Sequence, residues 1–431
     1  MKNNYSVFRD RFEKLKSLIA AKYPESPNGI ILLLGNFEHE TIKFKQESSF
    51  YYLTGIEEPG SVLTSPISSD GILFVPRYQE PRSKWMSGCI EPSDKQAQEI
   101  FVQNIEYLGD ACRGYNIYPN FSQNEYRNLI EFLKVVVSKK VAIFTLCPDK
   151  PGAYVNQRIQ LERLARFVPE LTERLVDISP LVAQLRRKKD KQEIELIYKA
   201  INCTMDAHET ALTILAPGIN ESKLQAAIEY AYASESCRAA FPSIVAGGKN
   251  STILHYHDNN TELKSGDLVV VDIGAEHDYY CADLTRTYPV SGKFTERQKE
   301  IYNLVLETQL YIQDLAVPGY WLNNKDFPEK SLNHLAKKFL DDAGYGKYFT
   351  HSIGHFLGID VHDVGDYSKP IEEGDVITIE PGIYIPEENL GVRIEDDYWI
   401  VDGEAICLSE ELPKDIDDIE KFMALEKEQG N

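Results

Sequence analysis

The chain has 431 residues, more than one hydrophobic core usually holds, so we expect at least two domains. Its formal net charge of −21 argues against nucleic acid or an anionic membrane as a partner. The seven cysteines include no CxxC pair, and the N-terminal segment lacks the apolar run of a signal peptide. We therefore expect reduced thiols, no membrane span and a cytoplasmic location.

The first part of the chain alternates between segments typical of helices and of strands. The pattern predicts helices over 5–22, 123–138 and 157–174, strands over 29–35, 71–76 and 140–146, and a strand-turn-strand unit over 49–64. This alternation indicates an α/β domain. We place its end within 175–185, which gives domains of 1–177 and 178–431. The basic run RRKKDK that follows is interpreted as a solvated linker, because the chain as a whole is acidic.

The second part of the chain repeats one order of elements. The pattern predicts helices over 191–215 and 221–236, and again over 296–316 and 328–343, with strands after each pair. Capping-box pairs, Asp190 with Glu193 and Thr295 with Gln298, mark the starts of the two long helices. The repetition indicates two related halves that face each other and hold a site between them. The tail over 410–430 is expected to form a terminal helix.

Three of the nine histidines lie in one Gly-rich stretch, HSIGHFLGIDVHDVG. They are His351, His355 and His362. From this stretch alone, a metal site and a set of packed structural histidines are both open. An HExxH zinc motif is excluded, because no Glu follows His351.

A pair of aspartates lies in an apolar, β-rich run, LVVVDIGAEHDYYCADLTRTYPV. If this run folds as a hairpin with His277-Asp278 at the turn, Asp272 and Asp283 lie directly opposite each other. Like charges in that arrangement destabilise a sheet, and an unpaired charge among apolar residues costs several kcal/mol. We therefore expect a cation to neutralise the pair.

A second hairpin repeats this arrangement with glutamates. In VITIEPGIYIPEENLGVRIEDDYWI, a turn centred on Glu387-Glu388 sets Glu380 opposite Glu395. Four carboxylates carry a charge of about −4, which two divalent cations would balance. Oxygen ligands with one imidazole favour Mn²⁺ or Co²⁺, with Zn²⁺ also open, and a two-metal site can polarise a carbonyl and activate water. The residues indicate a dinuclear metallohydrolase.

The segments DIGAEHDYYCADLTRTYPV, HSIGHFLGIDVHDVG, ITIEPGIYI and GVRIEDD resemble the pita-bread metallopeptidases, specifically the Xaa-Pro aminopeptidases (aminopeptidase P) and prolidases. These motifs cover about residues 241–400, and the two-domain layout extends the resemblance to the whole chain. The resemblance implies an α/β (α+β) fold. A creatinase-like α/β domain (1–177) would serve oligomerisation and substrate access, and a pita-bread domain (178–431) with pseudo-two-fold symmetric halves would be catalytic. It also implies a homodimer or homotetramer.

The same resemblance assigns roles to individual carboxylates and imidazoles. It implies that two divalent ions, with Mn²⁺ expected first, are bound by Asp272, Asp283, His355, Glu380 and Glu395. Glu380 would also accept a proton from the attacking water as a general base.

Further side chains would contact the substrate or assist the reaction. The resemblance implies this for His255, His351, His362, Arg393, Tyr384 and Trp85. The three histidines would bind substrate and stabilise the intermediate. Arg393 would assist water activation or pair with Asp283 and Glu395, the two carboxylates that would bridge the ions. Trp85 matches an N-domain tryptophan that approaches an active site, sometimes that of a neighbouring subunit. The chain departs from the usual His-Gly pair at Ser352, a departure that bears on His351 and not on the metal role of His355.

The activity implied first is that of an Xaa-Pro aminopeptidase, which releases the N-terminal residue of peptides with proline in second place. A prolidase, restricted to Xaa-Pro dipeptides, is the alternative, and a non-catalytic pita-bread peptide-binding protein is a remote one. The short segment between VHDVG and EPG favours the aminopeptidase, and the five retained ligands disfavour the non-catalytic protein. Proline-containing peptides are the expected partners.

Overall fold

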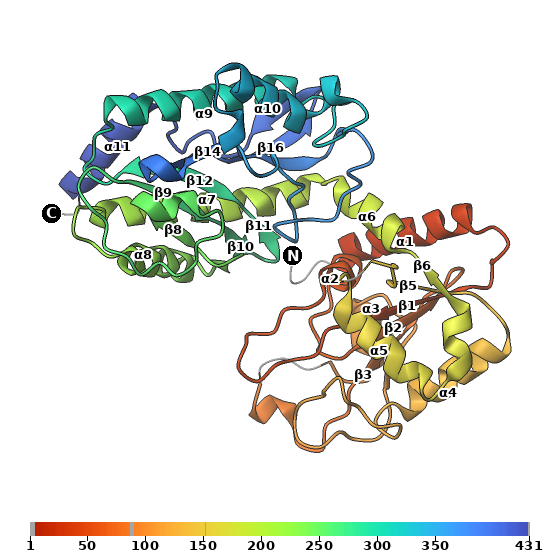
Figure 1. Cartoon of the computed structure of the whole chain (residues 1–431). Helices are drawn as coiled ribbons and strands as arrows, with labels where there is room; N and C mark the ends of the chain where they lie inside the picture. The colour runs from red at the N-terminus through yellow and green to blue at the C-terminus, as the bar shows by residue number, and fades with distance from the viewer. Residues whose placement is uncertain (1–4, 87–89, 151, 430–431) are drawn as a thin grey trace. The chain divides into compact units, whose positions relative to one another are not determined.

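The computed structural model of the chain describes residues 5–86, 90–150 and 152–429. The chain divides into two compact units, Met1–Leu185 and Arg186–Asn431, which are treated separately below (Figure 1). Within the described residues, none of the helices combines the length and the apolar character that crossing a bilayer requires.

The first unit is built on a mixed six-stranded sheet with the order β4-β3-β2-β1-β5-β6. Strand β1 is antiparallel to β2 and parallel to β5, so the sheet mixes hairpin and crossover connections. The strands are β1 (Ile30–Leu34), β2 (Val62–Pro66), β3 (Ile72–Val75), β4 (Asn104–Tyr107), β5 (Ile143–Thr145) and β6 (Leu175–Asp177). The helices are α1 (Tyr5–Lys22), α2 (Ser48–Thr54), α3 (Asp94–Glu99), α4 (Arg127–Ser138), α5 (Val155–Ala165) and α6 (Ser179–Arg187), the last two residues of which belong to the second unit. The α/β class predicted for this part of the chain is confirmed.

The strand-turn-strand unit predicted over 49–64 is wrong, because its first half is helix α2. The carboxylate of Glu47 accepts a hydrogen bond from the backbone N–H of Phe50 and so caps the N-terminus of the helix. Gly55 ends the helix in the left-handed conformation, with φ of 65°. The aromatic side chains that favoured a strand are all buried, and their packing overrides the local β-propensity.

The second unit repeats helix pairs followed by strands, as the sequence predicts (Figure 1). The helices are α7 (Lys191–Ile214), α8 (Glu221–Ser234), α9 (Glu296–Leu315), α10 (Leu332–Asp342) and the terminal α11 (Ile416–Gln429). One half holds a sheet of β8 (Ile244–Gly247), β9 (Leu268–Ile273) and β12 (Leu284–Pro289), and a small sheet of β7 (Arg238–Ala239), β10 (Ala275–His277) and β11 (Tyr280–Cys281). The other half holds β13 (Val376–Ile379) with β16 (Asp396–Val401) and β17 (Glu404–Cys407), and β14 (Gly382–Ile385) with β15 (Leu390–Arg393).

The ends of the two long helices match each other. Both predicted capping boxes form, at Asp190 with Glu193 and at Thr295 with Gln298. Each long helix is followed by a Pro-Gly pair whose glycine is left-handed, with φ of 90° at Gly218 and 97° at Gly319. The internal repeat read from the sequence is therefore also a repeat of backbone geometry.

The interpretation of RRKKDK as a solvated linker is wrong for three of its basic residues. Arg186, Arg187 and Lys189 are buried in the second unit. Lys189 contacts Asp363 at 3.1 Å, Arg186 also pairs with Asp363, and Arg187 pairs with Asp375. The partners lie more than 170 residues further along the chain, so local charge gave no sign of them. A buried charge needs such a partner, and these ion pairs hold the 360–375 loop in place.

Candidate metal centre and active site

The β9–β12 hairpin has a register different from the predicted one. Asp272 on β9 pairs with Thr285 on β12, and the turn consists of Asp278 and Tyr279, both with positive φ. Two successive left-handed residues are the geometry of a tight hairpin turn, and they shift the turn by one residue. Asp283 therefore does not lie directly opposite Asp272, and that expectation is wrong. The two carboxylates are nevertheless close enough for Asp272 to raise the pKa of Asp283.

The second hairpin has the predicted register. Gly382 pairs with Arg393 in β14–β15, and Ile379 pairs with Asp396 in β13–β16. The two ladders share one register, so Glu380 and Glu395 lie opposite each other in the gap between them. The turn of this hairpin is the 3₁₀ helix η6 (Pro386–Glu388) followed by a left-handed residue.

Ligand atoms from both halves of the second unit converge at these hairpins. Asp283, His355 and Glu395 each offer one ligand atom, and these atoms lie within 4.8 Å of one another. His355 Nε2 lies 3.4 Å from Asp283 Oδ2 and 3.9 Å from Glu380 Oε1. A β-bridge between Thr285 and Glu395 joins the halves, and the Thr285 hydroxyl donates to Glu395 Oε2 at 2.7 Å.

The loop that carries His355 packs closely against β13. A Cβ on Gly354 would lie 2.0 Å from the carbonyl oxygen of Thr378, so this position requires glycine. His355 Nδ1 lies 3.1 Å from the carbonyl oxygen of Phe356 and donates to it in the neutral ring. The lone pair of Nε2 is then left facing the carboxylates, the arrangement of a metal-binding imidazole.

The buried carboxylates lack the partners that four negative charges need. Asp272 Oδ1 and Asp283 Oδ1 are buried and accept no hydrogen bond in the described part of the chain. Burial, reinforced by neighbouring carboxylates, raises the pKa of Asp283 and of Glu395 well above the usual range. Burial also raises the pKa of Glu380 to about 8. Carboxylate oxygens with one imidazole suit divalent cations such as Mn²⁺, so this donor set fits the metals that the resemblance implies.

A chain of hydrogen bonds runs from Asp272 towards His351. Arg393 donates to Asp272 Oδ2 at 2.6 Å and to the Tyr384 hydroxyl at 2.8 Å, and that hydroxyl lies 2.8 Å from His351 Nε2. Burial and the Arg393 charge lower the pKa of His351 to about 4, so its ring is neutral at pH 7. Its Nδ1 lies 2.8 Å from the backbone carbonyl of Ser352. Any residue at 352 offers that carbonyl, so the serine leaves this contact intact.

The other residues predicted to contact substrate are His255, His362 and Trp85, and their surroundings differ. The ring of His362 is 4.2 Å from that of His355, so these two histidines are neighbours. His255 contributes to the lowered pKa of both His351 and His362, after the larger effect of burial. Trp85 lies in the first unit, stacked on Tyr115 at 4.8 Å and 56% exposed. Its predicted role at an active site stays a prediction.

Thr285 and Asp397 belong to the quoted motifs and contact the ligands, but they were given no role from the sequence. Thr285 binds the side chain of Glu395, as described above, and Asp397 accepts a hydrogen bond from the backbone N–H of Asp283 at 3.1 Å. Asp397 is completely buried. Its position two residues after Glu395, in a β-rich run, was a signal of the same kind that singled out the four ligand carboxylates.

Known proteins resemble this chain over most of its length. Residues 195–402 match the family described as metallopeptidase family M24, and residues 8–111 match the aminopeptidase P N-terminal domain. An Xaa-Pro aminopeptidase of Haemophilus influenzae is 30% identical over 96% of this chain and 97% of its own. Xaa-Pro aminopeptidase 3 of Homo sapiens is 33% identical over 88% of this chain and 76% of its own. The solved aminopeptidase PepP of Pseudomonas aeruginosa superposes with a TM-score of 0.82 at 26% identity, over 99% of each chain.

Proposed function

Because the chain belongs to the pita-bread metallopeptidases of family M24, we propose that the carboxylate cluster is the active site of an Xaa-Pro aminopeptidase. The chain is a hydrolase that releases the N-terminal residue of peptides with proline in second place. The aminopeptidase P N-terminal domain favours this activity over that of a prolidase. The observation that carries the proposal is the convergence of Asp283, His355 and Glu395 in a buried site with unpartnered oxygens.

The proposed ligands are those named from the sequence, and they would hold two divalent ions. They are Asp272, Asp283, His355, Glu380 and Glu395. When bound, such ions polarise the scissile carbonyl and lower the pKa of water. Mn²⁺ is the proposed metal, with Co²⁺ and Zn²⁺ as alternatives. A homodimer or homotetramer and a cytoplasmic location stay predictions.

The protein's own groups would move the proton and hold the substrate. Glu380 would accept the proton of the attacking water on a carboxylate oxygen and pass it to the departing proline nitrogen. Arg393 fixes the orientation of Asp272 and, through Tyr384, of the His351 ring. His255, His351 and His362 would contact the substrate, where imidazole N–H groups can stabilise a developing oxyanion.

The choice of proline follows from its chemistry. The proline nitrogen carries no N–H, so a peptidase that docks its substrate as a strand loses a hydrogen bond there. A site that activates the carbonyl with cations does not need that N–H. The carboxylate cluster therefore suits a bond that other peptidases cleave poorly.

Substrate length distinguishes the candidate activities. Purified protein with added Mn²⁺ is given an Xaa-Pro-Yaa tripeptide and the matching Xaa-Pro dipeptide, and release of the free N-terminal amino acid is measured. The proposal predicts rapid cleavage of the tripeptide. Cleavage of the dipeptide alone would show a prolidase, and binding without any cleavage would show a non-catalytic protein. Glu395→Gln is the control, because it retains the shape of the side chain and removes its charge.

A further inference from the structure

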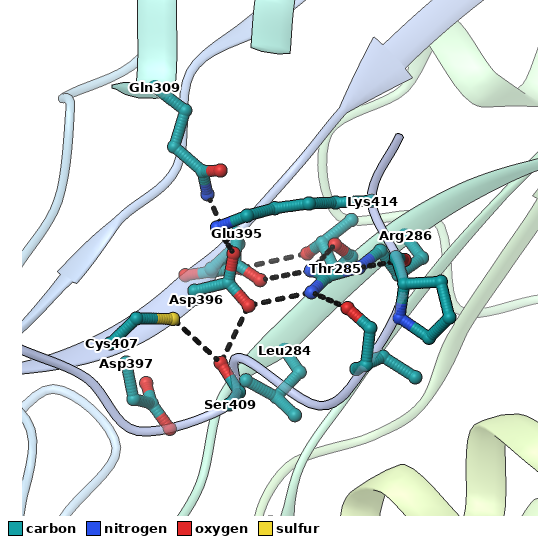
Figure 2. Close-up of polar contacts among 12 residues, drawn as sticks. Leu284, Thr285, Arg286, Gln309, Glu395, Asp396, Asp397, Cys407, Ser409 and Lys414 are labelled. Atoms are coloured by element: carbon teal, nitrogen blue, oxygen red, sulfur yellow. Dashed lines mark hydrogen bonds and ion pairs between the residues drawn. The ribbon is translucent and has the colours of Figure 1, made fainter. Parts of the chain in front are cut away.

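A second charged cluster surrounds Asp396, the residue next to the proposed ligand Glu395 (Figure 2). Glu395 forms a β-bridge with Thr285 and Asp396 begins β16. Successive side chains of extended backbone alternate between faces, so these two side chains point in opposite directions. Asp396 pairs with Arg286 at 2.7 Å, and neither side chain has any exposed surface. The resemblance assigned no role to either residue.

Every N–H donor of the Arg286 guanidinium has a hydrogen-bond acceptor. Its Nη1 donates to the backbone carbonyls of Glu395 at 2.8 Å and Thr285 at 3.0 Å. Its Nη2 donates to Asp396 Oδ1 and to the carbonyl of Leu412, and its Nε donates to the carbonyl of Pro413. These contacts account for all five N–H donors of the side chain. Arg286 therefore clamps both residues of the β-bridge that presents Glu395 to the site.

Each oxygen of the Asp396 carboxylate likewise accepts two hydrogen bonds. Its Oδ1 accepts from Arg286 and from the Ser409 hydroxyl at 2.6 Å, and its Oδ2 accepts from Gln309 and Lys414, each at 3.1 Å. Figure 2 shows these groups around Asp396. Two donors on each oxygen fix the rotation of the carboxylate, so Arg286 meets a rigid partner.

The cluster also reaches the residue next to Glu380. The amide nitrogen of Gln309 donates both to Asp396 Oδ2 and to the backbone carbonyl of Ile379 at 3.1 Å. Ile379 pairs with Asp396 across the β13–β16 ladder and precedes Glu380 in the chain. One set of side chains thus holds the backbone at both members of the Glu380–Glu395 pair.

We propose that Arg286 and Asp396, with Gln309, Ser409 and Lys414, form a positioning cluster that sets the two glutamates at the spacing that metal binding requires. The proposal rests on the proposed function, because it takes Glu380 and Glu395 as ligands. Residues that orient metal ligands typically change metal affinity by about 10- to 100-fold when mutated. A competing explanation is that the cluster only staples the 409–414 segment to the core, and that explanation predicts a loss of stability without a change in metal affinity.

The test measures Mn²⁺ affinity by calorimetry on metal-free protein, alongside the thermal unfolding midpoint. Arg286→Lys retains the charge but cannot make five directed hydrogen bonds, so we expect affinity to fall by about 10- to 100-fold in molecules that remain folded. Ser409→Ala removes one hydrogen bond to Asp396 and should lower affinity by about 2- to 10-fold. It decides the question alone if Arg286→Lys does not fold.

Arg82→Lys is the matched control. Arg82 pairs with Glu38 in the first unit at 2.8 Å, with both side chains only 4% exposed, and neither residue is a proposed ligand. This variant should lose stability and keep wild-type Mn²⁺ affinity. Wild-type affinity in Arg286→Lys and Ser409→Ala would overturn the positioning role and leave the proposed function standing. A wild-type protein that binds no Mn²⁺ would overturn the proposed function itself.

Discussion

Glu395 and Asp396 are adjacent at the start of β16, and the charged clusters on their two faces differ in character. On the Asp396 face, the guanidinium and the carboxylate have a partner for every hydrogen-bonding position. On the Glu395 face, buried carboxylates lie close together, and one oxygen of Asp272 and one of Asp283, the Oδ1 atom in each case, have no hydrogen-bond partner in the described residues. Because burying an unpaired charge is costly, the fully paired charges of Arg286 and Asp396 indicate a structural support, and the incompletely paired carboxylates indicate a binding site.

On the Glu395 face, where the carboxylates are incompletely paired, removing a charge should abolish activity. Glu395→Gln deletes a proposed ligand, and losing several kcal/mol of transition-state stabilisation corresponds to a rate loss of about 10³-fold or more. Without metal, the same variant should be as stable as wild type or more stable, because burial and the neighbouring carboxylates raise the pKa of Glu395 and the amide removes the cost of keeping that carboxyl protonated. Activity assays and chemical denaturation in the presence of a chelator measure the two effects. An active variant would contradict the ligand role of Glu395.

On the Asp396 face, where every charge is paired, removing a charge should have the opposite effect on stability. Asp396→Asn leaves the fully buried Arg286 without a counter-charge, which typically costs about 3–5 kcal/mol of unfolding free energy. Chemical denaturation with chelator present compares this variant with Glu395→Gln. Equal effects from the two substitutions would break the distinction between the faces.

Metal should stabilise the protein through the Glu395 face. An ion that binds only the folded state adds about 2.7 kcal/mol to the unfolding free energy when its free concentration is 100 times the dissociation constant. We expect Mn²⁺ to raise the melting temperature of wild type and a chelator to reverse the change. Asp283→Asn should show little response, and a full response in that variant would remove Asp283 from the site.

The pH dependence of stability should also come from the Glu395 face. The pKa of Glu380 is raised to about 8 by burial, so the folded metal-free protein holds a proton there that the unfolded chain releases near its ordinary pKa of 4.5. Stability from this group is present at low pH and is lost as the pH rises towards 8.

Asp396 provides the contrast within the same pH range. Burial acts to raise its pKa, but Arg286 and Lys414 hold the pKa below its usual value. The group is therefore ionised in both states above pH 5 and adds no slope. Denaturation of metal-free protein between pH 5 and 8 should show a decline in stability that is smaller in Glu380→Gln. An unchanged decline in that variant would assign the slope to other groups.

The smallest expected effect concerns the hydroxyl between Arg393 and His351. Tyr384→Phe removes two hydrogen bonds of 2.8 Å and leaves the His351 ring held only by the backbone carbonyl of Ser352. The bond to His351 is worth about 0.5–1.5 kcal/mol, so we expect kcat/KM to fall by about 2- to 13-fold with Mn²⁺ affinity unchanged. A parallel loss of Mn²⁺ affinity would place Tyr384 in the support of the metals instead.

Much of the second unit was predictable because its signals are local. The capping boxes at Asp190 and Thr295 place the helix starts at the next residue in each case. The register of the Glu380–Glu395 hairpin follows from its turn. The register of the Asp272–Asp283 hairpin was missed by one residue at the turn, because Asp278 and Tyr279 rather than His277 and Asp278 take positive φ. A tyrosine in that conformation is not expected from sequence preference.

The buried arginines and helix α2 could not be predicted from the sequence, because they depend on residues far away in the chain. Arg186 is buried by Asp363, and Arg286 is buried by Asp396 and by carbonyls near residue 412. Arginine and lysine are usually exposed, so the sequence alone favours a solvated position for them. Their burial can be recognised only when the fold shows the acidic residues that pair with them. Helix α2 was misread for a similar reason, since tertiary packing of aromatic residues decides its conformation.

The most direct test of the central claim is a Mn²⁺ titration of chelator-treated protein, with bound ions and Xaa-Pro-Yaa hydrolysis measured in the same samples. We predict no hydrolysis without metal, and activity that rises as up to two ions bind per chain. Full activity of a protein shown to contain no divalent metal would contradict the assignment of the buried carboxylates as a metal centre.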